Sequence, residues 1–293
     1  MLIIEPSMLG SVHPTNKFIK PSMLKNTITP DWESPSNIHA FTTTRATHIH
    51  GQAGVSVAPF DRFNIATHVG DDTHAVARNR ALLREIVPNE PLWLNQTHGV
   101  AVFSNSDQSN TQTHCNGIPE ADAVLVTEPN QVAVIMTADC LPVLFTTRQG
   151  DMVAGAHAGW RSLVNGVLEN TVQAMCDAGA ERADILAWLG PAIGAAQFEV
   201  GAEVRAQFIQ AGLAAGIPEG KTSACFTQRP EQRASQKYCA DIYALARQRL
   251  QLAGVLDANI SGGGLCTVSD AQKFYSYRRD GVTGRMASVI WFE

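Results

Sequence analysis

Two apolar runs that each end at a chemically reactive side chain place the strongest constraint on how this chain folds. Residues 132–136 (VAVIM) lead into Asp139 and Cys140, and residues 152–156 (MVAGA) lead into His157. Runs of this length with valine and isoleucine predict buried strands, although periodicity alone leaves short helices open. The ends of neighbouring strands can meet in space while lying 17 positions apart in the sequence. We therefore expect Cys140 and His157 to share one site.

Composition and charge narrow the class of protein. The chain has 293 residues, of which 45% are hydrophobic and 17% charged, and this composition fits an ordinary globular protein. The formal net charge of −5 gives no electrostatic reason to expect a nucleic-acid or membrane partner, so local arginines would have to hold any phosphate-bearing ligand. The six cysteines form no C-x-x-C pair, and neither a signal-peptide pattern nor a membrane-spanning apolar run is found. We expect a cytoplasmic protein with reduced thiols and leave its oligomeric state open.

The order of the predicted elements favours a single mixed α/β domain. Strands are predicted at 38–44, 92–98, 121–128, 132–136, 152–156, 185–189 and 287–292. Helices are predicted around 202–209 and after the candidate N-caps Asp71 or Asp72, Ser162 and Asp241. Because several strands follow one another directly, a mixed α/β or α+β domain is favoured over a doubly wound parallel fold. Residues 1–30 show no sustained period and predict an N-terminal extension, so we assign the domain to residues 31–293.

Three side chains, His98, Cys140 and His157, each stand where an apolar strand meets a turn. Two imidazoles and a thiolate match the preferences of Zn²⁺, and three protein ligands would leave the fourth tetrahedral position open for water or substrate. Copper fits the same ligands. The alternative is a buried cysteine that packs as a small hydrophobe and two histidines satisfied in loops. Spacings of 42 and 17 residues match no short zinc signature, so the residues by themselves leave both interpretations open.

A metal-free interpretation uses the same residues. Cys140 would be a nucleophile and His157 its general base, as in thiol hydrolases. Asp139 would complete a triad only if the strand broke at Ala138, because neighbouring side chains in a strand point to opposite faces.

The arginines indicate an anionic ligand. Arg45 ends a predicted strand, Arg161 lies near a predicted helix start, and Arg278 follows two tyrosines. Arginine offers bidentate donors suited to phosphate or carboxylate. Surface ion pairing is the simpler alternative for each of them. The neighbouring Tyr275 and Tyr277 can stack on a planar base or pack in the core.

Seven stretches together resemble the laccase-domain family. They are FNIATHVGDD, WLNQTHG, VIMTADCLPV, AHAGWRS, WLGPAIG, FEVG and KFYSYRRDGVTGRMASVIW. This family is described both as polyphenol oxidases and as YfiH-type purine nucleoside phosphorylases, and the resemblance covers residues 38–293. It implies a single α/β domain of layered sheets flanked by helices. It further implies a zinc or copper site whose ligands fall on His98, Cys140 and His157.

The resemblance also implies an activity. The family reaction is phosphorolysis of adenosine, inosine and methylthioadenosine to the free base and ribose 1-phosphate, with adenosine deamination beside it. The implied partners are therefore small molecules, namely purine nucleosides and phosphate. In this interpretation Arg45, His68, Arg161 and Arg278 bind substrate or phosphate, and Asp139 joins the three metal ligands as a catalytic residue. Either Asp139 or His68 would carry the proton.

Two alternative functions remain open, and the sequence differs from the family pattern at one place. A copper-loaded polyphenol oxidase is the first rival, but one cysteine and two histidines make at most a mononuclear site. A thiol hydrolase that edits cytoplasmic peptidoglycan precursors is the second. The family's TTR-x-GGVS pattern is interrupted here by a longer insertion between Arg45 and residues 54–56, and this insertion contains His48 and His50.

Overall fold

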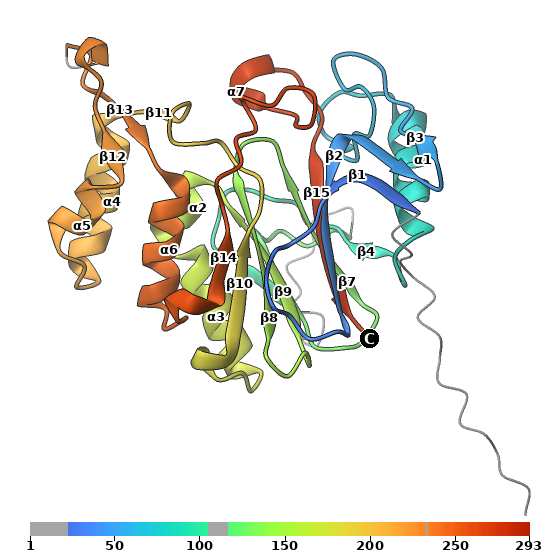
Figure 1. The fold of residues 1–293 in the computed structure, drawn as a ribbon, viewed down its shortest axis with the longest axis horizontal. Helices are drawn as coiled ribbons and strands as arrows, with labels where there is room; N and C mark the ends of the chain where they lie inside the picture. Colours follow the sequence, from blue (N-terminus) through green and yellow to red (C-terminus); the bar gives the residue numbers. More distant parts are fainter. Residues whose placement is uncertain (1–22, 105–116, 233) are drawn as a thin grey trace, which may run out of the picture.

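The computed structural model describes residues 23–104, 117–232 and 234–293. Two six-stranded sheets lie face to face at its centre, with helices on both outer sides (Figure 1). A smaller three-stranded sheet and two helices form the left-hand end in the same view. The predicted mixed α/β architecture of layered sheets and flanking helices is confirmed.

The first sheet runs in the order β1-β2-β15-β7-β4, with β3 paired to β2. Its strands are β1 (Leu24–Ile28), β2 (Ile38–Ile49), β3 (Gln52–Ala53), β4 (Pro91–Leu92), β7 (Val132–Thr137) and β15 (Met286–Phe292). The second sheet runs in the order β14-β10-β8-β9-β6-β5. Its strands are β5 (Val102–Ser104), β6 (Ala123–Val126), β8 (Leu141–Thr147), β9 (Val153–Ala158), β10 (Ile185–Leu189) and β14 (Ile260–Gly262). Each of these sheets mixes parallel and antiparallel pairs.

The remaining elements surround this sandwich. The third sheet is built from β11 (Glu199–Gly201), β12 (Phe226–Thr227) and β13 (Lys237–Ala240). The helices are α1 (Thr73–Arg84), α2 (Trp160–Asn165), α3 (Val167–Asp177), α4 (Ala202–Ala214), α5 (Glu219–Ser223), α6 (Ile242–Leu252) and α7 (Tyr277–Asp280). In Figure 1, α1 covers the outer side of the first sheet, and α3 and α6 cover the second.

The alternation of side chains along β7 explains why its sequence is continuously apolar. Val134 and Met136 pack in the core beneath α1, whereas Ala133 and Ile135 pack between the two sheets. Both faces of the strand are therefore buried. On the opposite sheet a Cβ at Gly155 would come within 2.9 Å of Ile135, so glycine lets the sheets approach closely at this point.

Two of the predicted helix starts are confirmed, and one is wrong. The carboxylates of Asp72 and Asp241 accept a hydrogen bond from the first turn of α1 and α6. Ser162, in contrast, is buried inside the first turn of α2, which begins after Gly159. Gly166 then adopts a left-handed conformation (φ +100°) that ends α2 and separates it from α3.

Strand pairing moves several predicted strand ends. β2 continues to Ile49 because it pairs with β1, so Arg45 lies within a strand rather than at its end. β1 itself falls inside the expected N-terminal extension, and ordered structure begins before Trp32; residues 1–22 lie outside the described residues. The strand predicted at 92–98 stops at Leu92.

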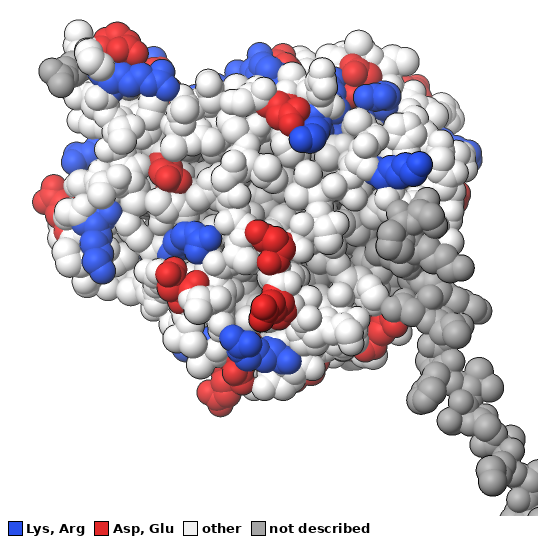
Figure 2. Space-filling view, in the orientation of Figure 1, with Lys and Arg blue, Asp and Glu red and all other residues white. Residues whose placement is uncertain are grey.

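The surface carries both signs of charge. Figure 2 shows lysines and arginines interspersed with acidic residues over the visible face, without a broad field of one sign. In the described parts of the chain, no helix combines the length and the apolar character that crossing a membrane requires.

Candidate metal centre

The centre lies where the chain crosses from the first sheet to the second. β7 ends at Thr137, β8 begins at Leu141, and the connection between them carries Asp139 and Cys140. Asp139 has a positive φ of 100°, which breaks the extended backbone just before the cysteine. The strand is therefore broken near Ala138, which is the condition under which the side chains of Asp139 and Cys140 could both face one site.

His98 belongs to the loop that follows β4. The Gln96 amide holds this loop against β7, because it donates to the Met136 carbonyl (2.9 Å) and accepts from the Met136 N–H (2.8 Å). His98 has a positive φ of 62°. Its Nε2 lies 3.6 Å from Cys140 Sγ.

His157 completes the group from the second sheet. It lies in β9 on the side that faces the first sheet, and its Nδ1 is 2.7 Å from Asp122 Oδ1. Asp122 also accepts hydrogen bonds from the backbone N–H groups of Thr97 (3.1 Å), His98 (3.0 Å) and Gly99 (2.6 Å). The Asp122 carboxylate therefore binds both the loop that carries His98 and the ring of His157.

The three side chains fit a metal ion by chemistry and by spacing. The donor atoms of His98, Cys140 and His157 lie within 4.8 Å of one another. The two imidazole rings meet edge to face at 4.7 Å. Tetrahedral Zn²⁺ would place its nitrogen and sulfur donors roughly 3.3–3.6 Å apart, and the 3.6 Å between His98 Nε2 and Cys140 Sγ agrees with this spacing. This is the one cluster of three such residues in the described parts of the chain.

The cysteine and histidine alter each other's ionisation. Burial by itself raises the pKa of the Cys140 thiol, but the neighbouring His157 and His98 outweigh it and lower the pKa to about 6. Burial opposes the charge on His157, yet Cys140 and Asp122 together raise its pKa to about 9. Without a metal, these neighbours therefore favour a thiolate beside an imidazolium. Asp122 is buried too, but the hydrogen bonds from His157 and Gly99 hold its pKa below the usual range.

A cavity of about 410 Å³ opens beside this cluster. Its walls include His68, Asp139, Arg161 and Arg278 of the predicted site. The structure does not bring Arg45 to it. The remaining lining residues are Gln96, His98, Met136, Thr137, Ala138, Cys140, His157, Trp160, Ile193, Phe198, Ile242, Tyr277 and Arg285.

Arg45 is engaged elsewhere. Its guanidinium donates to the Asp61 carboxylate (3.0 Å) and the Ala271 carbonyl (3.1 Å), and it stacks on the Tyr275 ring. It lines a second hollow, of about 550 Å³, together with Arg62 and Lys273. The Tyr275 ring is itself buried, as its alternative interpretation as a core residue predicted.

Asp139 uses both oxygens to hold neighbouring segments. Oδ1 accepts from the Thr267 hydroxyl (2.5 Å), and Oδ2 accepts from the backbone N–H of Arg278 (2.6 Å). Its carbonyl also accepts from the Ile193 N–H. The side chain next to Cys140 thus ties together the loops that form the cavity wall.

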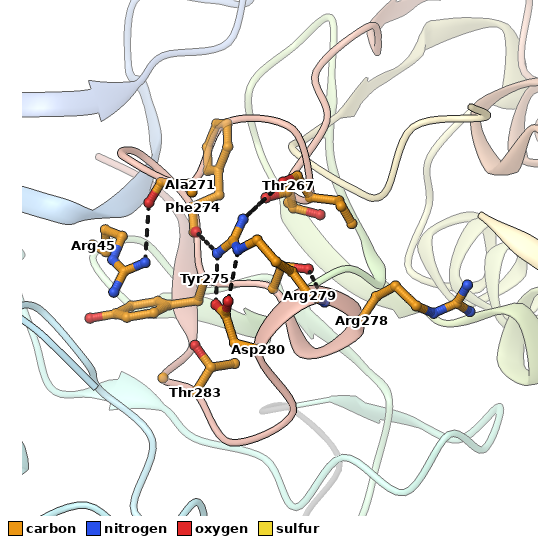
Figure 3. A network of polar contacts seen from close by, with 12 residues as sticks. Arg45, Thr267, Ala271, Phe274, Tyr275, Arg278, Arg279, Asp280 and Thr283 are labelled. Atoms are coloured by element: carbon orange, nitrogen blue, oxygen red, sulfur yellow. Dashed lines mark hydrogen bonds and ion pairs between the residues drawn. The ribbon is translucent and has the colours of Figure 1, made fainter. Parts of the chain in front are cut away.

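The segment around α7 forms one edge of the cavity. Figure 3 shows the Arg279 guanidinium bound to the carbonyls of Thr267 and Phe274 and to the Asp280 carboxylate. Arg278 points the other way, and its guanidinium donates to the Glu199 carbonyl (3.0 Å). Tyr277, a residue that is 63% exposed, lies at the edge of the cavity.

Three residues that were not expected from the sequence lie in or around the site. Gln96 and Arg285 line the cavity, and Asp122 holds two of the ligand segments. Burial lowers the pKa of Arg285, while Cys140 and Asp139 nearby oppose this shift. Arg285 lies within the resembling C-terminal motif, which was its only signal. The sequence signal for Asp122 was its position as the single carboxylate within the apolar run of residues 121–126.

Comparison with known proteins assigns the family. Residues 39–293 match the model of the family described as multi-copper polyphenol oxidoreductase laccase. The chain belongs to this family. The family resemblance inferred from the sequence motifs is confirmed.

Relatives cover nearly the whole chain. A protein of Haemophilus influenzae named purine nucleoside phosphorylase is 46% identical over 91% of this chain and 99% of its own length. Purine nucleoside phosphorylase YfiH of Escherichia coli K12 is 44% identical over 90% of this chain and 98% of its own. A crystal structure of a Neisseria meningitidis protein matches with a TM-score of 0.77 and 41% identity, over 92% of this chain and 100% of that one.

Proposed function

We propose that this chain is a metal-dependent purine nucleoside phosphorylase. It would convert adenosine, inosine or methylthioadenosine and phosphate into the free base and ribose 1-phosphate. The observation that carries the proposal is the meeting of His98, Cys140 and His157 with three cavity arginines, Arg161, Arg278 and Arg285, around one hollow. The names of the relatives at 44–46% identity support the same activity.

The cavity suits a nucleoside beside an anion. Its volume of about 410 Å³ is within the range of small-ligand pockets. Ile193, Phe198 and Ile242 offer apolar surface to a base, while Arg161 and Arg285 offer positive charge to phosphate. Arg45 has no place in this proposal, because its guanidinium is bound in the second hollow.

Phosphorolysis needs positioning and charge stabilisation. A phosphate oxygen forms the bond to the anomeric carbon, and the bond from that carbon to the purine nitrogen breaks with its electron pair leaving on the purine. The purine then takes up a proton. Arginines that hold phosphate in line with the anomeric carbon would lower the barrier, because this carbon becomes cationic as the purine leaves.

His68 is the favoured proton carrier in this proposal. Both oxygens of Asp139, the other candidate, already accept hydrogen bonds from Thr267 and Arg278. Burial and the positive charge of Arg285 lower the pKa of His68, so its imidazole is neutral at neutral pH. It would relay a proton, accepting one from dihydrogen phosphate at one ring nitrogen and passing one to the purine from the other.

We propose Zn²⁺ as the metal, with His98, Cys140 and His157 as ligands, and Cu²⁺ as the alternative. A bound zinc ion supplies Lewis acidity and an open coordination position. Adenosine deamination is proposed as a second activity of the same cavity, because it uses that open position. We place the protein in the cytoplasm, where a ligating Cys140 stays reduced; the five described cysteines are free thiols.

Product formation tests the proposal. Purified zinc-loaded protein with adenosine and phosphate is expected to release adenine and ribose 1-phosphate, and ammonia release without phosphate would report deamination. Cys140→Ala should abolish turnover, and Arg285→Gln should raise the KM for phosphate. The exposed Arg78 of α1 offers a matched control, since Arg78→Gln should behave as the unaltered protein. Absence of both phosphorolysis products, or full activity in Cys140→Ala, would refute the proposal.

A thiol hydrolase is the second candidate, because His157 lowers the pKa of the Cys140 thiol and Cys140 raises the pKa of His157, which favours a thiolate beside an imidazolium. It predicts an acyl group on Cys140 after incubation with peptidoglycan precursors, measured by mass spectrometry. The polyphenol oxidase implied by the family description predicts oxygen uptake with phenols by copper-loaded protein. A mononuclear site in the described residues argues against four-electron reduction of O₂.

A further inference from the structure

We propose that Asp122 is the positioning residue that assembles the metal centre. It would fix the tautomer of His157 and, through backbone N–H groups, the placement of His98. The inference rests on the metal site proposed above. It concerns a residue that touches neither substrate nor metal, and acts through both histidine ligands.

The carboxylate of Asp122 is fully buried and surrounded by hydrogen-bond donors. Oδ1 receives the ring Nδ1 of His157 at 2.7 Å and the backbone N–H of His98 at 3.0 Å. Oδ2 receives the backbone N–H groups of Thr97 at 3.1 Å and Gly99 at 2.6 Å. The Asp122 carbonyl accepts the backbone N–H of His157 at 2.7 Å, so the strand and the ring are held together.

These contacts determine which nitrogen of His157 can bind a metal. An ionised carboxylate only accepts hydrogen bonds, so Nδ1 must carry the proton. Nε2, on the side of Cys140, is then the nitrogen whose lone pair a metal ion can take, by displacing any proton bound there. A carboxylate at this position therefore selects the tautomer that a metal ligand needs.

The same carboxylate shapes the loop of His98. Consecutive N–H groups of Thr97, His98 and Gly99 converge on it, as in backbone nests that bind anions. His98 is held in a left-handed conformation that a non-glycine residue seldom adopts, and this conformation presents its Nε2 to Cys140. Removing the acceptor would free the loop to relax.

Asparagine has nearly the same size but cannot make these contacts. If its NH₂ group stands at the Oδ1 position, it faces the His98 N–H and forces His157 Nδ1 to accept, which moves the proton to Nε2. If it stands at the Oδ2 position, it faces the N–H groups of Thr97 and Gly99. The first orientation disables His157 as a ligand, and the second removes two of the three backbone contacts that hold the loop of His98. Only an acceptor at both positions therefore serves both histidines.

Metal affinity tests the inference without relying on turnover. Zn²⁺ and Co²⁺ are titrated into metal-free protein against a chromophoric chelator, and the Co²⁺ absorption spectrum is recorded. Asp122→Asn should weaken binding by about 10–100-fold and alter the cobalt spectrum. Glu169→Gln is the matched control, because this half-buried carboxylate of α3 pairs with Arg249 of α6 and has no printed contact with either histidine. It should leave the metal affinity and the cobalt spectrum unchanged.

A second measurement needs no variant, in case Asp122→Asn does not fold. Two-bond ¹H–¹⁵N correlation spectra of zinc-loaded, ¹⁵N-histidine-labelled protein should show His157 protonated at Nδ1 and bare at Nε2. A His157 protonated at Nε2, or an Asp122→Asn protein with unchanged affinity and spectrum, would overturn the inference and leave the metal site standing. Failure of the unaltered protein to bind zinc or cobalt would overturn the metal site, and the inference with it.

Discussion

Gly159 separates the ligand side chains from the first turn of α2 and leaves no room for a side chain. A Cβ at this position would lie 2.7 Å from the His98 ring and 3.1 Å from Cys140 Sγ. Close-packed sites tolerate added methyl groups poorly, at a cost of about 1–3 kcal/mol. The small residue before α2 is thus part of the metal centre, because it lets two ligands lie against the helix start.

Gly159→Ala is expected to weaken zinc binding by displacing His98 and Cys140. Chelator competition measures the affinity, and urea unfolding measures the free energy of unfolding. Gly220→Ala is the matched control, because a Cβ there meets nothing within 4 Å and the residue lies in a helix. Equal zinc affinities in the two variants would contradict the crowding argument.

The Cys140 thiol should react as a thiolate at unusually low pH in metal-free protein. His157 and His98 stabilise the thiolate and lower the pKa of the thiol to about 6. The rate of alkylation by iodoacetamide should therefore rise with pH and reach half its maximum near this pKa. A free thiol would reach half its maximum at a pH of about 8.5. Mass spectrometry follows the modification.

His157→Ala removes the main stabilising charge, so the midpoint of Cys140 alkylation should move to higher pH. Cys225 serves as an internal control, because burial raises the pKa of its thiol to about 11 and it should stay unmodified near neutral pH. A midpoint near pH 8.5 in the unaltered protein would show that the imidazoles do not act on the thiol.

At the scale of elements, α7 is a single helical turn held in place by its neighbours. Arg279 donates to the carbonyls of Thr267 and Phe274 and pairs with Asp280. The adjacent Arg278 and Tyr277 form the edge of the cavity. A helix this short has little stability of its own, so the network decides its position.

Arg279→Met is expected to lower the free energy of unfolding by about 1–3 kcal/mol, because it leaves buried carbonyls without donors. In the proposed reaction it should raise the KM for the nucleoside more than it lowers kcat, since no contact to the metal ligands is lost. Steady-state kinetics and thermal unfolding measure both effects. A fall in kcat with unchanged KM would argue against a role in shaping the cavity edge.

Element prediction succeeded where the signal is local. Buried runs at 132–136 and 185–189 are strands, and Asp72 and Asp241 cap helices, because apolar periodicity and capping depend on nearby residues. The prediction that Ser162 caps a helix was wrong, because the helix already begins after Gly159. The left-handed Gly166 then divides the expected helix into α2 and α3. Strand lengths also departed, because pairing partners set them.

At the scale of the whole molecule, the metal centre joins the two central sheets. His98 follows β4 of the first sheet, Cys140 lies in the connection between the sheets, and His157 lies in β9 of the second. A metal ion bound to all three would link the layers of the sandwich. Ligands that bind only the folded state stabilise it in proportion to the logarithm of their concentration.

Removing the metal is therefore expected to lower the melting temperature. At a free zinc concentration of 100 Kd the loss corresponds to about 2.7 kcal/mol. Calorimetry of zinc-loaded and chelator-treated protein measures the shift. In Cys140→Ala, the melting temperatures of the zinc-loaded and chelator-treated protein should differ much less. If the unaltered protein melts at the same temperature with and without zinc, the metal does not link the two sheets.

Local sequence patterns were enough to predict the mixed layered architecture, the family and the three residue types of the candidate metal centre, because apolar runs and the turns that end them lie within short segments. The tertiary structure sets which other side chains reach that centre. It brought Arg285 to the cavity, bound Arg45 to Asp61, and gave both oxygens of Asp139 to neighbouring loops. It also joined Asp122 to segments far along the chain. The physical reason is that a side chain's partners depend on strand register and on how two sheets cross, and neither is written in the residues nearby.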